Sequence, residues 1–351
     1  MSLLTYKYDK QFTLESGKKL RELEIGYHTY GKLNAERNNV IWVNHALTAN
    51  SDVTEWWPGL FGENELFNPE DFFIVCANVL GSPYGTTNPL SINPLTGQPY
   101  YLAFPQYTVR DVVNGHKLLA DHLGINQIHT LIGGSMGGQQ ALEWAYQEPG
   151  RFNHLIAIAT NARHSAWGVA FNESQRLAIR ADRTFFGNTP DGGAKGLRAA
   201  RSMALLSYRG YKTYDVTQRE EDNEVADNFK ASSYQRYQGE KLVDRFNAYS
   251  YWYLSKAMDS HNLARGRESI DAVLGKIKAR TLIIGIKSDI LFPVEEQQLL
   301  ARKIPNAVYT EVDSFYGHDG FLIETEILTQ TIGAFLNKKP HAKIVALNKT
   351  A

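Results

Sequence analysis

The sequence predicts an α/β protein with a mostly parallel central sheet, helices on both faces of that sheet, and a helical insertion. Two observations support this prediction. Short apolar runs alternate with amphipathic helical patterns, and the alternation stops between residues 163 and 270 before it resumes. The chain has 351 residues, of which 43% are hydrophobic, and can therefore bury the core that such a sheet needs.

The predicted strands are apolar at successive positions, not at every second one. Strands of this kind suit a sheet that is covered on both faces, which is typical of parallel sheets. Before them, two alternating segments flank the turn-like "ESGKK", so the sheet is expected to begin with antiparallel strands. The apolar runs are "VIWVN" at 40–44, "FFIVCANV" at 72–79, "IHTLIGG" at 128–134, "HLIAIAT" at 154–160, "TLIIGI" at 281–286 and "AVYTEV" at 307–312.

Helical patterns lie between these runs. In "TVRDVVNGHKLLADHLG" the apolar residues recur at helical spacing, and Thr108 with Asp111 fits a capping box. Between 163 and 270 three segments have helical periodicity, and no apolar strand run separates them. We therefore expect residues 1–162 and 271–351 to form the core, and residues 163–270 to form a helical lid.

Composition narrows the classes of function. Lys+Arg and Asp+Glu number 37 each, and no long basic run offers the positive field that nucleic acid or an anionic membrane attracts. We expect small-molecule partners, no nucleic acid and no membrane. The N-terminus lacks the order of a signal peptide, which favours a cytoplasmic protein. The single cysteine, Cys76, lies in an apolar run and is expected to be a buried hydrophobe.

The stretch "LIGGSMGGQQALEWA" places Ser135 among glycines between a predicted strand and a predicted helix. It fits G-x-S-x-G, the nucleophile elbow, in which a sharp turn raises the serine above the sheet at a helix N-terminus. Glycines on both sides remove side chains that would collide in such a turn. We expect Ser135 to be a nucleophile; a turn of small residues made for packing is the alternative.

A serine hydroxyl needs a base that takes its proton and an acid that orients the base. In folds with a nucleophile elbow, the acid and then the histidine follow the serine in the sequence, each on a loop after a later strand. Asp289 in "KSDILFP" and His318 in "YGHDGF" meet that order. His45 precedes the serine, and Asp313 and Asp319 lie too close to the histidine to come from the preceding loop. The elbow serine, Asp289 and His318 are therefore the predicted triad.

An oxyanion site must complete this arrangement. The tetrahedral intermediate of acyl transfer carries a negative oxygen that two backbone N–H groups hold. In this fold one N–H belongs to the residue after the nucleophile, here Met136. The other belongs to an early loop, here "NHALTAN", in which Leu47 is the candidate.

Several motifs together resemble the homoserine O-acetyltransferase family, acyl-CoA-dependent enzymes of the α/β-hydrolase fold. The similarity runs between residues 10 and 337. It implies a ping-pong reaction in which acetyl-CoA, a co-substrate, acylates the serine and L-homoserine then accepts the acetyl group in methionine biosynthesis. It implies no metal, no permanently bound cofactor, and a homodimer formed through the helical lid. The motifs are "NHALTANSD", "NVLGSPYGTTNPLSINPLTGQPY", "FPQYTVRDVV", "GGSMGGQQALEWA", "AFNESQRLAI", "SDILFP" and "YGHDGFLIE".

The resemblance also implies how the acceptor is held. Family members bind the acceptor carboxylate with an arginine on the insertion. Arg201 in "AARSMALLSYR" matches that arginine, and Arg209 is the second arginine of the motif. Arginine suits this role because its planar fork pairs with a carboxylate in bidentate fashion. Asp319 matches the position that binds the amino group. Without the resemblance, a surface salt bridge would be the simpler expectation for a lid arginine.

One loop departs from the family pattern. Where many members have G-G-C-x-G-[ST]-T-G-P, this chain has "GSPYGTTNP" at 81–89, a loop expected near the mouth of the site. The altered loop keeps two alternatives open, a serine O-acyltransferase and a homoserine O-succinyltransferase. A third alternative is an esterase in which water accepts the acyl group, because the triad alone does not distinguish water from an alcohol. Arg201 and Asp319 speak against the esterase. A non-catalytic binding module is the weakest alternative because the triad is complete.

Overall fold

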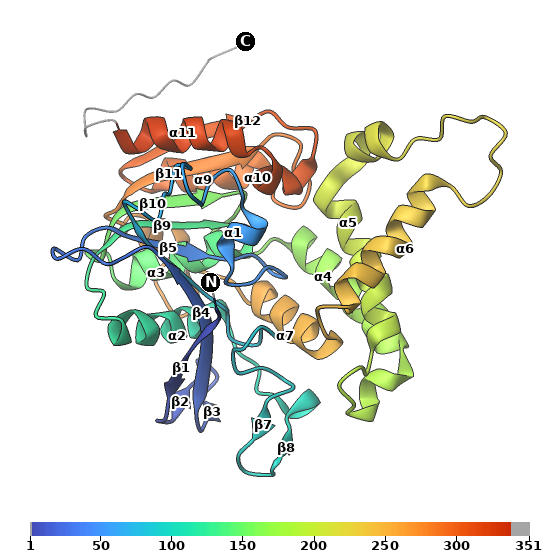
Figure 1. Ribbon diagram of the computed structural model, residues 1–351, viewed down its shortest axis with the longest axis horizontal. Coiled ribbons are helices and arrows are strands. Elements are labelled where there is room, and N and C mark those ends of the chain that lie inside the picture. The colour runs from blue at the N-terminus through green and yellow to red at the C-terminus, as the bar shows by residue number, and fades with distance from the viewer. Residues whose placement is uncertain (1, 338–351) are drawn as a thin grey trace.

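The computed structural model describes residues 2–337, and their centre is one eight-stranded sheet (Figure 1). The first two strands in spatial order, β1 and β4, are antiparallel to each other, and β4 is antiparallel to β6. From β6 onward all neighbouring strands are parallel. The spatial order is β1 (Leu4–Tyr8), β4 (Leu23–Tyr30), β6 (Phe73–Ala77), β5 (Val40–Asn44), β9 (Ile128–Gly134), β10 (Phe152–Ile158), β11 (Arg280–Ile286) and β12 (Ala307–Val312).

The sheet separates two apolar clusters, and this explains why its strands are apolar at successive positions. Along β5, Val40 and Trp42 belong to one cluster, while Ile41 and Val43 belong to the other. All four side chains are fully buried. Since neighbouring residues of a strand point to opposite faces, a strand covered on both sides needs apolar residues at every position.

Helices cover both faces of the sheet. The cluster of Val40 and Trp42 includes residues of α2 (Val109–His122), α3 (Met136–Gln147) and α9 (Val294–Lys303). The cluster on the opposite face includes residues of α1 (Val53–Trp56) and α11 (Thr325–Asn337). Thr108 caps α2 with the predicted capping box, in which its side chain accepts from the N–H of Asp111 and that carboxylate accepts from the N–H of Thr108.

Four helices of 12 to 24 residues follow β10 and precede the next strand of the sheet, and in Figure 1 α4, α5 and α6 stand beside the sheet. The longest, α5, is kinked at Gly210, whose φ of 71° is disfavoured for residues with a side chain. The backbone before this kink lies against the loop of the predicted catalytic histidine: a Cβ at Gly317 would be 2.7 Å from the Tyr208 and Arg209 carbonyl oxygens. These helices are α4 (Ala166–Ala181), α5 (Ala194–Thr217), α6 (Lys230–Val243) and α7 (Ala248–Asp259).

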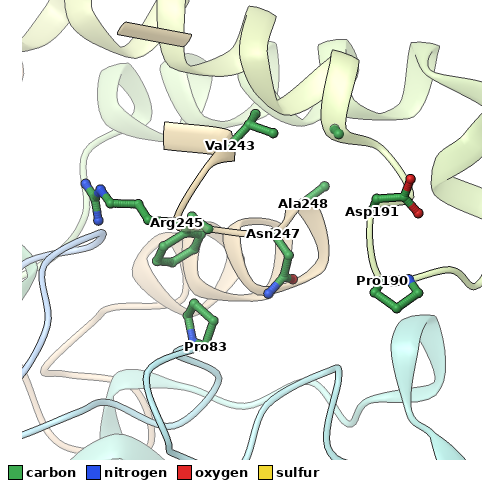
Figure 2. A pocket seen from close by; sticks show the side chains of 9 residues that line it. Pro83, Pro190, Asp191, Val243, Arg245, Asn247 and Ala248 are labelled. Carbon is green, nitrogen blue, oxygen red and sulfur yellow. The ribbon is translucent and has the colours of Figure 1, made fainter. Parts of the chain in front are cut away.

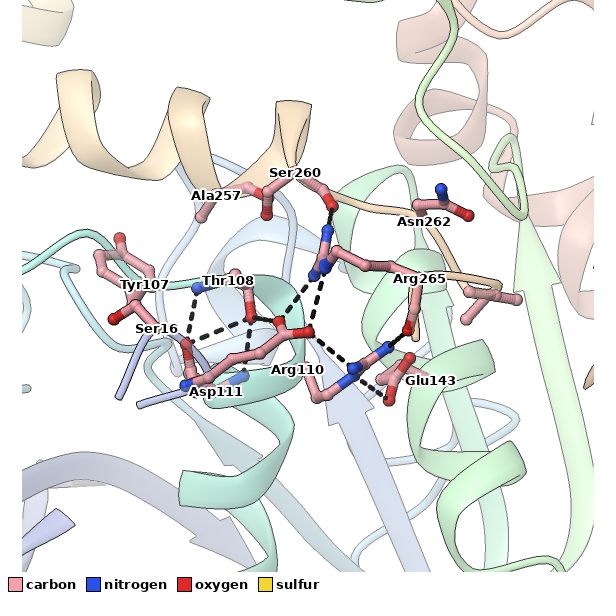
Figure 3. A network of polar contacts seen from close by, with 12 residues as sticks. Ser16, Tyr107, Thr108, Arg110, Asp111, Glu143, Ala257, Ser260, Asn262 and Arg265 are labelled. Atoms are coloured by element: carbon pink, nitrogen blue, oxygen red, sulfur yellow. Dashed lines mark hydrogen bonds and ion pairs between the residues drawn. The ribbon is translucent and has the colours of Figure 1, made fainter. Parts of the chain in front are cut away.

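A network of charges joins the segment after α7 to the core (Figure 3). Arg265 of that segment donates from Nε to Glu15 Oε1 at 3.0 Å, and Arg110 of α2 donates from Nη1 to the same oxygen at 2.6 Å. Arg110 also donates from Nε to Glu143 Oε1 of α3 at 3.2 Å. The network therefore holds the returning chain against the N-terminal region and two core helices.

The predicted fold is confirmed, including the antiparallel start and the parallel strands that follow. The six strands predicted from apolar runs agree with the observed ones to within two residues at each end. Residues 338–351 of the predicted core lie outside the described residues. Short elements that the sequence did not predict complete the structure: β2 (Phe12–Thr13), β3 (Lys19–Leu20), β7 (Ile92–Asn93), β8 (Gln98–Pro99), η1 (Tyr101–Ala103), η2 (Arg183–Gly187), α8 (Ile270–Leu274), η3 (Gly317–Asp319) and α10 (Gly320–Ile323).

Candidate active site

Ser135 occupies the sharp turn between β9 and α3. Its φ is 57° and its ψ is −126°, a backbone conformation that is unfavourable for a residue with a Cβ. The turn is possible because its neighbours are glycines. A Cβ at Gly137 would lie 2.1 Å from the Asn44 carbonyl oxygen, and one at Gly133 would lie 2.4 Å from the Gly137 carbonyl. The glycines therefore let the elbow pack against itself and against β5.

Asp289 and His318 meet although they are far apart in the sequence. Asp289 follows β11, His318 follows β12, and His318 Nδ1 lies 2.6 Å from Asp289 Oδ2. The other oxygen, Oδ1, accepts from the backbone N–H groups of Leu291 and Phe292 at 2.8 and 2.9 Å. A carboxylate that accepts from Nδ1 orients the ring and leaves Nε2 available as a base.

The rival candidates have other environments. Asp313 is paired with exposed Lys287 at 3.5 Å and does not contact the histidine. His45 is fully buried, and its Nε2 accepts from the Val79 backbone N–H at 3.1 Å, as a neutral imidazole does. Burial lowers the pKa of His45 to about 4. His45 is therefore a structural residue beneath the loop that contains Leu47.

A cavity of about 330 Å³ lies between the sheet edge and the helices that follow β10. Asp289 and Met136 are not among the lining residues: Asp289 lies behind His318, and Met136 is fully buried at the start of α3. The cavity thus brings the predicted nucleophile and base together with residues of the helices that follow β10. The predicted site residues that line it are Leu47, Ser135, Arg201, His318 and Asp319.

The two predicted oxyanion donors are backbone N–H groups that are not used in hydrogen bonds within the described residues. In the part of the chain that the structure describes, neither the Leu47 N–H nor the Met136 N–H has a hydrogen-bond acceptor. Met136 is the first residue of α3, where helix N–H groups lack partners within the helix and the helix dipole favours negative charge. Free N–H groups beside Ser135 are what a developing oxyanion requires.

The lid arginines differ in their partners. Arg209 donates from Nε to Asp319 Oδ2 at 3.0 Å. Arg201 lines the cavity with its guanidinium 5.5 Å from the centre of the Tyr208 ring, and no carboxylate among residues 2–337 is within ion-pair distance of it. Burial raises the pKa of Asp319, while Arg209, Arg201 and His318 oppose that rise. Arg201 is thus the arginine that is left without an anionic partner.

Two supports of the elbow were missed by the sequence reasoning. Thr160, just after β10, donates from Oγ1 to the Ser135 carbonyl oxygen at 2.8 Å. Its own carbonyl oxygen accepts from Gln297 Nε2 of α9 at 2.7 Å. The turn after β10 therefore connects the nucleophile to α9, the helix that follows the Asp289 loop.

The next residue makes a parallel connection. Asn161 Oδ1 accepts from Gln139 Nε2 of α3 at 3.0 Å, and Asn161 Nδ2 donates to Glu296 Oε2 of α9 at 2.9 Å. Burial raises the pKa of Glu296 to about 7, and the nearby Asp289 and Glu295 carboxylates contribute to the rise. The available sequence signal was a polar pair directly after an apolar strand, at the edge of the sheet where parallel α/β folds place their sites.

The described residues offer no other obvious centre of chemistry. Among residues 2–337, no three His, Cys, Asp or Glu side chains gather as metal ligands do. Within the same range, no helix is long and apolar enough to cross a membrane. Cys76 is buried, and burial raises its pKa well above the ordinary value, so it is a poor nucleophile.

This fold and this arrangement of serine, histidine and aspartate define a class of enzymes that form an acyl-serine on an α/β-hydrolase scaffold. A family model described as the alpha/beta hydrolase fold matches residues 39–325. A homoserine O-acetyltransferase from Cyclobacterium marinum is 49% identical over 323 residues, which cover 92% of each chain. The chain therefore belongs to the homoserine O-acetyltransferase family of α/β-hydrolase-fold proteins.

Solved structures agree with this family assignment. The homoserine O-acetyltransferase from Bacillus anthracis superposes with a TM-score of 0.88 at 26% identity, over 97% of this chain and 99% of that one. Esterase E22 shares the fold, with a TM-score of 0.87 at 24% identity, over 96% of this chain and all of the other. The same fold is therefore found in a protein described as an esterase, so the fold by itself does not identify the reaction.

Proposed function

We propose that the protein transfers an acetyl group from acetyl-CoA to the hydroxyl of L-homoserine, through an acyl-serine on Ser135. The observation that carries the proposal is one cavity in which Ser135 and His318 face Arg201, a lid arginine without an anionic partner. The high similarity to homoserine O-acetyltransferases supports the same reaction. The product, O-acetyl-L-homoserine, serves methionine biosynthesis.

In the first half-reaction, Ser135 Oγ attacks the thioester carbonyl while His318 Nε2 takes the hydroxyl proton. The carbonyl π electrons move to the oxygen, which the N–H groups of Leu47 and Met136 stabilise. The intermediate then expels the sulfur of CoA, which takes the proton from the imidazolium and leaves as the free thiol. Asp289 stabilises the imidazolium through Nδ1 throughout.

In the second half-reaction, the homoserine hydroxyl attacks the acyl-serine carbonyl and gives its proton to His318 Nε2. The new oxyanion occupies the same pair of N–H groups. Its collapse breaks the bond to Ser135 Oγ, which recovers its proton from His318. Each proton and electron pair is accounted for by the chain and its two substrates, so the proposal includes no permanently bound cofactor and no metal.

The acceptor is a zwitterion, and the cavity offers a partner for each charge. Arg201 binds the carboxylate, and Asp319 binds the ammonium group. Asp319 Oδ2 accepts from Arg209, while Oδ1 has no hydrogen-bond partner in the described part of the chain. Arg209 is therefore proposed to hold the Asp319 carboxylate in place for the ammonium, and not to bind substrate.

We also propose the organisation inferred from the sequence: a core of residues 1–162 and 271–351, a lid of residues 163–270, a cytoplasmic location and a homodimer formed through the lid. Apolar side chains exposed on the lid helices support the dimer, because an interface would remove them from water. Sedimentation equilibrium measures the mass in solution. The exposed apolar side chains on the lid helices are those of Leu206, Tyr211, Val216 and Tyr237, each more than half exposed.

The test of the activity is the release of free thiol from acetyl-CoA by purified protein, with homoserine, with serine or without an acceptor. Mass spectrometry identifies the acetylated product. Homoserine-dependent release is expected. Equal release without any acceptor would refute the transferase and support the esterase alternative.

The loop at 81–89 differs from the family pattern, and this difference leaves two alternative reactions within the family to be tested. Pro83 lines a second cavity beside the lid, and Tyr84 OH accepts from Arg245, which lines the catalytic cavity. The loop can therefore influence which donor or acceptor fits. Parallel assays with succinyl-CoA and with serine test the homoserine O-succinyltransferase and the serine O-acyltransferase.

A further inference from the structure

Two cations of the catalytic cavity have no role in the proposed chemistry. Lys241, near the end of α6, and Arg245, two residues beyond that helix, both line the cavity. Neither has a carboxylate within ion-pair distance among residues 2–337. Other lid cations do: Arg198 pairs with Glu240 at 2.7 Å. Cations that have no anionic partner and are grouped at one cavity favour an anionic ligand there.

The charges of the acceptor are already matched by Arg201 and Asp319. The cavity lining contains three cations, Arg201, Lys241 and Arg245, and two carboxylates, Glu55 and Asp319. Asp319 is paired with Arg209, and Glu55 accepts from an asparagine amide. The lining therefore retains positive charge after the acceptor is bound, and that charge belongs to the part of the cavity formed by α6 and the residues after it.

Arg245 is held where a second space begins. Its Nη1 donates to the Thr48 carbonyl oxygen at 2.6 Å and to Tyr84 OH at 2.5 Å, both of them neutral acceptors. Arg245 also lines a neighbouring cavity of about 350 Å³, and Asp191 lies on the opposite side of that cavity (Figure 2). The two cavities thus adjoin at this guanidinium, and they offer room for a substrate longer than the catalytic cavity.

We propose that Lys241 and Arg245 bind the phosphate groups of the acyl-CoA donor at the mouth of the catalytic cavity. The inference rests on the proposed function, since it assumes that an acyl-CoA brings its thioester to Ser135. Phosphate oxygens accept charge-assisted hydrogen bonds from ammonium and guanidinium groups, and Arg245 is already positioned by its two neutral partners. Asp191 disfavours phosphate on the far side of the second cavity, so the phosphates lie on the Arg245 side.

The kinetic test compares two thioester donors with the same acetyl group. Acetyl-CoA carries phosphates, and S-acetyl-N-acetylcysteamine carries none. Lys241→Ala should raise the KM for acetyl-CoA about tenfold, the lower end of the loss expected for one hydrogen bond to a charged group. The KM values for S-acetyl-N-acetylcysteamine and for homoserine should stay unchanged. Arg245→Gln, which keeps an N–H donor for Thr48 and Tyr84, should act in the same direction.

Arg236 provides the matched control. It is an exposed cation on the same helix, α6, and lines neither cavity, so Arg236→Ala should leave the KM for acetyl-CoA unchanged. Added salt should raise the KM of the wild-type protein for acetyl-CoA more than that of Lys241→Ala, because screening weakens exposed charge pairs. A KM for acetyl-CoA that both cavity variants leave unchanged would overturn the proposal, as would an equal rise for both thioesters.

Two further experiments distinguish phosphate binding from recognition of the acyl group and from failure of the proposed reaction. If Lys241→Ala affects succinyl-CoA and not acetyl-CoA, the cations recognise the acyl carboxylate, and the phosphate proposal is wrong. Calorimetric titration of Ser135→Ala protein with CoA measures donor binding without turnover. If the double variant Ser135→Ala, Lys241→Ala binds CoA more weakly than Ser135→Ala does, the phosphate site is supported, even if the protein does not acetylate homoserine. Unchanged binding refutes the phosphate site, even if the protein does acetylate homoserine.

Discussion

The two walls of the catalytic cavity are built in different ways. On the core wall, Ser135 and His318 lie in turns at the ends of sheet strands, and each is no more than 5% exposed. On the lid wall, Arg201 and Tyr208 project from α5, a kinked helix that is partly exposed. The core wall is connected by buried hydrogen bonds to α3 and α9. The lid wall meets the histidine loop through contacts such as Arg209 with Asp319 and Thr213 with the Phe315 carbonyl oxygen.

This difference indicates that the core wall supports the bond-making steps and that the lid wall recognises the substrates. A rigid sheet edge can hold a nucleophile and its base to within a fraction of an ångström, which bond-making chemistry requires. A helical insertion can change its residues without disturbing that geometry, so it suits the recognition of donor and acceptor. We therefore expect core-wall substitutions to reduce both half-reactions and lid-wall substitutions to affect individual substrates.

The largest effect is expected at Ser135, the proposed nucleophile. Ser135→Ala should lower kcat by about 10⁴-fold or more, because no acyl-enzyme can form. Mass spectrometry of the protein after incubation with acetyl-CoA should show an added acetyl group in the wild type and none in the variant. Circular dichroism and thermal unfolding control for the fold. Turnover near the wild-type rate would show that Ser135 is not the nucleophile.

The next effect tests the lid wall. Arg201→Ala should raise the KM for homoserine about 10- to 100-fold, the cost of losing a bidentate ion pair with a carboxylate. The rate of Ser135 acylation by acetyl-CoA, measured in a single turnover without acceptor, should stay near wild type. Arg201→Lys should recover part of the loss. An equal decrease in both half-reactions would contradict the division between the walls.

A smaller effect tests the support behind the elbow. Thr160→Val removes the hydroxyl that donates to the Ser135 carbonyl oxygen, and should lower kcat about fivefold, the value of one ordinary hydrogen bond. Both half-reactions should slow to the same extent because both use Ser135. Thr160→Ser keeps the donor and should behave as wild type. If the serine variant loses as much as valine, the methyl packing matters and not the hydrogen bond.

The smallest effect concerns stability and not activity. The pKa of Glu296 is raised from 4.5 to about 7 by burial, so between these values the unfolded chain releases a proton that the folded chain retains. Folded-state stability due to this group is therefore present at low pH and declines as the pH rises towards 7. Relative to wild type, Glu296→Gln should gain about 1 kcal/mol between pH 5 and pH 8, after allowance for partial solvent exposure.

Thermal or denaturant unfolding at the two pH values measures that gain, and the comparison with wild type cancels the titration of all other groups. Glu295→Gln is the matched control, since Glu295 precedes Glu296 on α9 but is exposed. It should show no comparable change with pH. A constant difference between Glu296→Gln and wild type across this range would contradict the raised pKa.

Much of the fold could be predicted because its signals are local. The apolar run "VIWVN" predicted a doubly covered strand, and β5 has the predicted bounds of 40–44. The G-x-S-x-G pattern placed Ser135 between a strand and a helix, where the structure has it. These predictions depend on backbone sterics and on side-chain periodicity, which act over a few residues.

Predictions about partners over long sequence distances were less complete. The order of motifs selected Asp289 and His318, and the structure brings them to 2.6 Å. By contrast, nothing in the sequence indicated that Asp319 would pair with Arg209 while Arg201 is left without an anion, because that choice depends on how α5 docks on the histidine loop. Thr160 was missed for the same reason: its role depends on the approach of α9.

The sequence alone determined the class of fold, the order of the proposed catalytic residues and the elbow that strains Ser135, since each follows from local patterns and from family motifs. Only the tertiary structure decided which lid cations are paired, where the two cavities adjoin, and which polar residues support the elbow from behind. Those features depend on distances between segments that are far apart in the chain. Such distances are set by the packing of α5, α6 and α9 against the sheet, and no short stretch of sequence encodes them.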